Sequence, residues 1–175
     1  MPLMTRKDRL RRVALLCAHF TRNLAYYRAA QGRITRTSLE FWRTVYSNFL
    51  DIAVLEWCKL FVDRNGKHTW EKVLTDPTNF KADLLRLMAI SGDELAVYVE
   101  KMRKYRNKFL AHLDDLPVMD IPFLDRAHAA VELYHRHITE HEVAIGDLSQ
   151  LPSDLAAYYL ACFEEAGRIY DRCLS

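Results

Sequence analysis

Glycine, proline and long apolar runs are all scarce in this sequence, and each scarcity removes a class of protein. The 175 residues include only 5 Gly and 5 Pro, too few for an all-β chain that turns about every 8–12 residues. No stretch approaches the roughly 18 apolar residues of a membrane span, and the run VALLCA near the start is shorter than the apolar part of a signal peptide. We therefore expect neither secretion nor a membrane partner.

Cysteine is sparse as well, and its spacing argues against a disulfide framework or a zinc site. The four cysteines form no CxxC pair and mostly sit inside apolar helical patterns, as buried free thiols do; they are Cys17, Cys58, Cys162 and Cys173. This usage predicts a reducing, cytoplasmic setting.

What the sequence does contain is helical periodicity with readable starts and stops. A hydrophobic share of 50% can fill one core, so we predict a single domain, 1–175, an all-α bundle of about six helices. Three starts read as Ser/Thr capping motifs, at Thr5, Thr37 and Ser91. The predicted helices are Thr5–Gly32, Thr37–Gly66, a shorter one from Asp76-Pro77, Ser91 to about Asp114, Asp120–Gly146 and Ser153–Leu174.

Charge is distributed unevenly along the chain. Residues 1–43 hold ten Lys/Arg and two acids, a net charge of +8, whereas residues 109–175 hold four bases and twelve acids, a net charge of −8. Between them, residues 101–108 hold five bases and no acid. Such asymmetry favours the binding of a polyanion at the basic end or of a subunit with complementary charge. The alternative is that these charges simply cover solvent-exposed helix faces.

The helix that starts at Ser91 carries the most informative residues. A helical wheel gathers one apolar stripe, made of Leu95, Tyr98, Val99, Met102, Phe109, Leu110 and Leu113. Arg106 falls within this stripe, about 30° from its centre, and a guanidinium in such a place must be paired or used. His112 lies at the edge of the stripe, about 9 Å further along the axis and roughly 120° around it. A two-fold dimer would bring two such Arg and two such His into one cleft.

The segment from Arg106-Asn107 to Ala111-His112 resembles the R-x4–6-H motif of the HEPN superfamily, with a polar residue after the Arg and a small one before the His. The stretch from Phe49 to Phe61 further resembles the second helix of HEPN proteins in the abortive-infection U-type group. The resemblance implies an up-and-down four-helix core with additional helices, a homodimer, and RNA cleavage without metal or other cofactor in toxin–antitoxin or phage-defence systems. An antitoxin protein is then a possible partner.

The chemistry of such a cleavage suits these residue types. The resemblance implies His112 as the base for a ribose 2′-hydroxyl and Arg106 as the cation that stabilises the phosphorane. Asn107 is suited to bond the phosphate or to orient His112. Sequence-independent attraction to the RNA backbone would come from neighbouring cations; they are Lys101, Arg103, Lys104 and Lys108. Asp114 departs from the tyrosine that some family members carry two residues beyond the histidine.

Three alternatives can be weighed on the sequence alone. In the first, Arg106 has a purely structural role and pairs with an acid of a neighbouring helix, for which Glu56 is the candidate. In the second, the chain is a non-catalytic module that binds a protein partner or a nucleotide. The third is a metal site, because His137 and His141 share a helical face. A di-iron bundle, however, needs a second Glu-x-x-His motif that the sequence lacks. We therefore predict no metal site.

Overall fold

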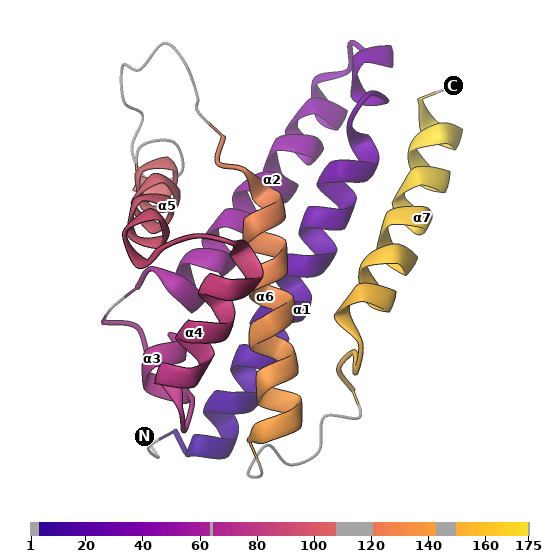
Figure 1. Ribbon diagram of the computed structural model, residues 1–175. Helices are drawn as coiled ribbons and strands as arrows, with labels where there is room; N and C mark the ends of the chain where they lie inside the picture. The colour runs from indigo at the N-terminus through magenta and orange to yellow at the C-terminus, as the bar shows by residue number, and fades with distance from the viewer. Residues whose placement is uncertain (1–3, 64, 108–120, 143–149, 175) are drawn as a thin grey trace.

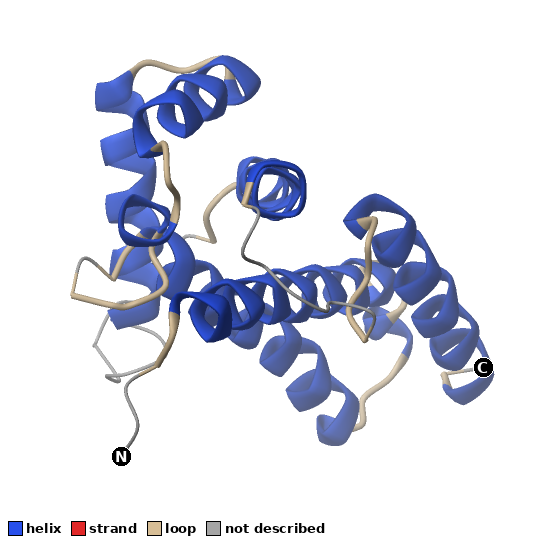
Figure 2. Cartoon of the chain, turned by 90° about the horizontal axis from the view of Figure 1, so that it is seen from below, coloured by secondary structure: helices blue, strands red, loops and turns tan. Residues whose placement is uncertain are grey.

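The computed structural model describes residues 4–63, 65–107, 121–142 and 150–174. Within these ranges the chain forms seven α-helices and no β-strand, which confirms the prediction of an all-α bundle (Figures 1 and 2). The elements are α1 (Arg6–Ala30), the 3-10 helix η1 (Ile34–Arg36), α2 (Glu40–Phe61), α3 (Trp70–Val73), α4 (Pro77–Met88), α5 (Gly92–Tyr105), α6 (Leu124–His141) and α7 (Leu155–Cys173). None of these helices combines the length and apolar character that a membrane crossing requires.

Helix α1 lies at the centre of the bundle, in contact with α2, α6 and α7. Of its 25 residues, 14 are buried, and they occupy more than one face, as in a helix that is covered on several sides. Phe20, Leu24 and Cys17 are completely buried in the main hydrophobic core. The rest of the fold is therefore arranged around the first helix of the chain.

The long helices around α1 run in both directions. Arg6 near the start of α1 pairs with Glu142 after α6, and Arg28 near its end pairs with Asp125 at the start of α6, so these two helices are antiparallel. Figure 1 shows that α2 also descends against α1, while α7 rises beside it toward the C-terminus. Helix α5 is seen end on in that view and so crosses the direction of α6.

A buried carboxylate joins three of these elements. Glu142, only 5% exposed, accepts hydrogen bonds from the backbone N–H of Thr75 at 2.7 Å and from its hydroxyl at 2.8 Å, and it pairs with Arg6. Arg6 also donates to the carbonyl of Val73 at 3.0 Å. The start of α1, the α3–α4 connection and the end of α6 are thus tied together.

Most helix starts follow the predicted signals, with one exception. Capping boxes at Thr5 and Ser91 and the Asp76 cap before Pro77 are all formed. The predicted box at Thr37 is wrong, because Leu39 precedes α2 and the Thr37 hydroxyl accepts from the Leu39 N–H at 3.1 Å, ahead of the helix. The short helix α3 was not predicted. The predicted helix limits at Asp114, Asp120 and Gly146 lie outside the described residues.

Candidate functional site

Helix α5 presents the candidate site residues, and its buried face fixes how it is rotated. Leu95, Tyr98 and Met102 of the predicted stripe are buried against the core. Tyr105, which lies outside that stripe, is also buried, at 1% exposure. Because these residues face the core, Arg103 and Arg106 face the segment that comes after α2.

Polar contacts anchor α5 along its length. The Tyr98 hydroxyl donates to the Phe123 carbonyl at 2.7 Å, and the Tyr105 hydroxyl donates to a carboxylate oxygen of Asp51 at 3.2 Å. The ring of Tyr98 also meets that of Trp57 on α2 edge to face, with centroids 5.5 Å apart. The site therefore stands on a helix that is held at its middle and at its C-terminal end.

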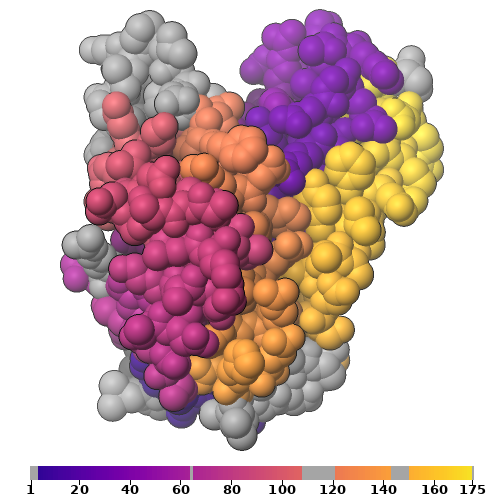
Figure 3. Space-filling view, in the orientation of Figure 1, coloured from indigo at the N-terminus to yellow at the C-terminus, as the bar shows by residue number. Residues whose placement is uncertain are grey.

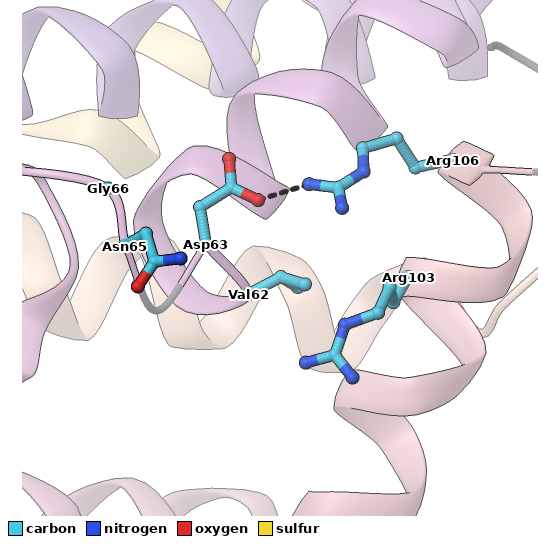
Figure 4. A pocket seen from close by; sticks show the side chains of 6 residues that line it. All are labelled: Val62, Asp63, Asn65, Gly66, Arg103 and Arg106. Atoms are coloured by element: carbon cyan, nitrogen blue, oxygen red, sulfur yellow. Dashed lines mark hydrogen bonds and ion pairs between the residues drawn. The ribbon is translucent and has the colours of Figure 1, made fainter.

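Arg106, directly after α5, is paired with Asp63, which follows α2 (Figure 4). Its Nη1 meets the carboxylate, and its Nε donates to the Asn107 side-chain oxygen at 3.1 Å. Among the described residues, its Nη2 has no hydrogen-bond partner. The guanidinium is thus fixed on two edges and retains donors on the third.

The acid that pairs with Arg106 is not the one named from the sequence. Glu56 lies on α2, about two helical turns before Asp63, and meets Lys59 on the same helix, at 3.2 Å. The expectation of a Glu56–Arg106 pair is therefore wrong, although an acid from the neighbouring segment does pair with Arg106. Asn107 is exposed and bonds to the guanidinium.

Arg103 and Arg106 line a cavity of about 530 Å³ with the segment after α2 (Figure 4). Val62, Asp63 and two turn residues, Asn65 and Gly66, complete its wall. The turn is tight, because the Gly66 N–H donates to the Asp63 carbonyl at 2.6 Å and a Cβ at Gly66 would lie 2.8 Å from that oxygen. We call this cavity the arginine pocket; two guanidiniums and one carboxylate give it a net positive lining.

Not all predicted site residues come together. Arg103 and Arg106 are three residues apart and share a helix face, whereas Lys101 lines a different hollow with Asp93 and Glu94 on another side of α5. Lys104 is exposed and does not line the arginine pocket. Lys108 and His112 lie outside the described residues.

The segment after α2 was missed as part of the site. The sequence marks Asn65-Gly66 as a helix stop, but nothing local links Asp63 to a residue 43 positions later. An acid immediately before a tight turn was the only available signal.

Cys58 lies close to the arginine pocket but is not a nucleophile there. Burial raises the pKa of its thiol to about 12, although the nearby Arg106 and Arg103 act in the opposite direction. A thiol with such a pKa is protonated at neutral pH, and its Sγ is directed at the Met102 carbonyl, 3.8 Å away. The chemistry of the site therefore falls to the other residues.

A second group of cations surrounds His68, two residues beyond the tight turn. Burial lowers the pKa of the His68 imidazole, and four nearby cations lower it further. These cations, which with His68 form what we call the His68 cluster, are Arg12, Arg9, Lys59 and Lys67. In the described part of the chain, Arg9 Nε and His68 Nδ1 are buried without a hydrogen-bond partner. Positive charge from α1, α2 and the connecting segment thus converges around His68.

Of the two histidines considered as metal ligands, His137 packs in the interior and His141 is exposed. His137 is buried with its ring 5.4 Å from that of Phe80 and 4.7 Å from that of His141. Within the ranges that the structure covers, no three His, Cys, Asp or Glu side chains gather as a metal site requires.

Neither a protein-family model, nor a curated protein, nor a solved structure matches this chain. The likeness to the HEPN superfamily accordingly remains a prediction that rests on the residues quoted for it.

Proposed function

We propose that this chain is a HEPN-like endoribonuclease that cleaves RNA without a metal ion. The observation that carries the proposal is the state of Arg106, whose guanidinium is steadied by Asp63 and Asn107 while its Nη2 keeps free donors among the described residues. A cation fixed in place before the reaction stabilises a developing charge more than one that must reorganise.

In the proposed reaction, the ribose 2′-oxygen forms a bond to phosphorus and the bond from phosphorus to the 5′-oxygen breaks. His112 accepts the 2′-hydroxyl proton, and the departing 5′-oxygen takes up a proton. Arg106 stabilises the pentavalent phosphorane between these steps. The products are a 2′,3′-cyclic phosphate and a 5′-hydroxyl end. In a two-fold dimer, a second Arg106 and a second His112 complete the site.

Two groups of cations support RNA as the substrate. One lines the arginine pocket, and the other, the His68 cluster, adds cations from α1 and α2. Phosphodiester backbones are bound chiefly through such charge, without regard to base sequence. The setting that we propose for this activity is toxin–antitoxin or phage defence, with an antitoxin protein as a partner.

The alternative is a non-catalytic helical module, and one observation favours it. Arg106 is neutralised by Asp63, so the ion pair can serve to join α5 to the end of α2. In that case, removal of the guanidinium lowers the stability of the fold, and the parent chain does not cleave RNA.

Cleavage of mixed-sequence RNA in excess chelator separates the two functions. We expect the purified chain to release 2′,3′-cyclic phosphate ends, and Arg106→Ala and His112→Ala each to lower the rate by about 10²–10³-fold. Arg106→Lys keeps the charge without the two-edged fork and should also be slow. Exposed Arg168→Ala on α7 is the matched control and should cleave as the parent chain does.

Thermal melting of each variant shows whether a loss of cleavage reflects unfolding. RNA methylated at every 2′-oxygen must resist cleavage, because the attacking group is blocked. Equal cleavage by the parent chain and both alanine variants would exclude the roles assigned to Arg106 and His112.

A further inference from the structure

A second cavity, of about 320 Å³, adjoins the arginine pocket between the end of α2 and helices α3, α4 and α5. Its floor is apolar and well packed, with Val62 only 3% and Leu84 only 1% exposed, and with Trp70 and Leu95 beside them. Figure 3 shows α4 and α5 lying against each other on this face of the molecule. The cavity thus combines an apolar floor with polar and charged side chains around it.

The two cavities share part of their walls. Val62 and Arg103 line both of them. Arg103 also meets Glu100 at 2.6 Å, and Glu100 stands on the rim of the second cavity together with Lys81. The two cavities are therefore neighbours, with Arg103 between them.

Thr69, which lines the second cavity, adds a buried hydroxyl to its wall. This residue is 2% exposed, and its Oγ1 is buried without a hydrogen-bond partner in the described part of the chain. It does not cap the short helix that follows it. A buried hydroxyl left without a partner costs free energy, and such groups are rare in folded proteins.

We propose that the second cavity binds the base of the RNA nucleotide whose phosphate lies between Arg103 and Arg106, an inference that rests on the proposed function. An apolar floor, a charged rim and one buried hydroxyl fit a flat ring that carries hydrogen-bonding groups on its edge. Proteins that bind single-stranded RNA hold unstacked bases in such places and the backbone with cations. We call this cavity the base pocket.

Binding of nucleoside 5′-monophosphates to the full chain tests the base pocket without any cleavage. Titration calorimetry should show that at least one of the four nucleotides binds at least tenfold more tightly than inorganic phosphate or the matching nucleoside. Each of these two probes fills only one of the adjoining cavities.

Two variants locate the bound base. Ala96→Phe fills the base pocket from its exposed rim on α5 and should weaken nucleotide binding about tenfold while phosphate binding is unchanged. Ala161→Phe makes the same change at an exposed position of α7 outside both cavities and should bind as the parent chain does. Thr69→Val removes Oγ1 with little change in shape, so it should weaken nucleotide binding without lowering the melting temperature.

The outcomes for the base pocket and for catalysis are separable. Nucleotide affinity equal to that for inorganic phosphate, or unchanged affinity in both Ala96→Phe and Thr69→Val, overturns the base pocket even if RNA is cleaved. Tight nucleotide binding that both variants weaken upholds the base pocket even if the chain cleaves no RNA.

Discussion

Asp63 determines how the Arg106 guanidinium is presented, because it holds one edge of the group while Asn107 holds another. The same carboxylate competes with any phosphate that enters the arginine pocket. By fixing the guanidinium, Asp63 should speed cleavage, and by competing with phosphate it should weaken RNA binding. The cleavage rate and the binding affinity therefore measure the two effects separately.

We predict that Asp63→Asn binds RNA a few-fold more tightly but cleaves it about tenfold more slowly in a single turnover. Binding improves because one negative charge is removed, and the rate falls because the guanidinium is no longer fixed. Asp83→Asn, which makes the same change in an ion pair of α4, is the control. Weaker RNA binding by Asp63→Asn would contradict this account.

Three histidines of α6, of which His135 and His137 are buried and His128 is partly buried, should make the stability of the fold sensitive to acid. Burial lowers the pKa of His128 to about 4, with Arg28 acting in the same direction, and burial also lowers the pKa values of His135 and His137. The folded state therefore binds fewer protons than the unfolded state between about pH 4 and 6.5. Stability is fully present above this range and is lost as the pH falls through it.

We predict that His128→Gln reduces the slope of unfolding free energy against pH between about 4 and 6.5. The slope should not vanish, because His135 and His137 remain. Urea unfolding of the variant and of the parent chain at several pH values measures this slope. An unaltered slope in His128→Gln would show that protonation of this residue is not coupled to unfolding.

At the scale of the helix, the local signals in the sequence were mostly sufficient. A capping box needs only residues three positions apart, so Thr5 and Ser91 could be recognised from the chain alone. Thr37 has the same pattern but lies just after η1, where the backbone has not yet entered α2. Helix α3 spans one turn, too short to show a hydrophobic period.

We predict that Ser91→Ala lowers the free energy of unfolding by about 1 kcal/mol, whereas Thr37→Ala changes it by much less. The Ser91 hydroxyl accepts a hydrogen bond from the Glu94 N–H at 3.2 Å at the start of α5. The Thr37 side chain does not cap α2. Denaturant titrations of the two variants measure their unfolding free energies. They compare two similar sequence motifs, of which only the one at Ser91 forms a helix cap. An equal loss of unfolding free energy in both variants would mean that the loss at Ser91 does not come from its helix cap.

At the scale of the whole molecule, the chain's uneven charge is gathered by the fold into specific places. Arg9 and Arg12 come from the basic first segment, and they meet Lys59 and Lys67 around His68 only because α1 packs beside α2. The sequence shows that the first segment is basic, but the neighbours of its cations depend on packing across many residues. The Arg106–Asp63 pair escaped prediction for the same reason.

We predict that Arg12→Glu weakens RNA binding about tenfold and reduces the slope of log affinity against log salt by about 0.7 for each RNA phosphate that the variant no longer neutralises. Arg168→Glu on α7 makes the same change in net charge away from the His68 cluster and should leave the slope unchanged. Fluorescence anisotropy with a labelled RNA at several salt concentrations measures both. Identical slopes for the two variants would exclude the His68 cluster from the RNA path.

The central place of α1 also bears on how the chain is made. Among the described helices, α1 leaves the ribosome first and α7 last, yet the two pack together, with Ala29 and Ala30 against Ala166 and Tyr170. Until α7 has been synthesised, the side of α1 that α7 covers is exposed to water. This apolar surface can aggregate during translation, and the packing of α7 removes it from solvent.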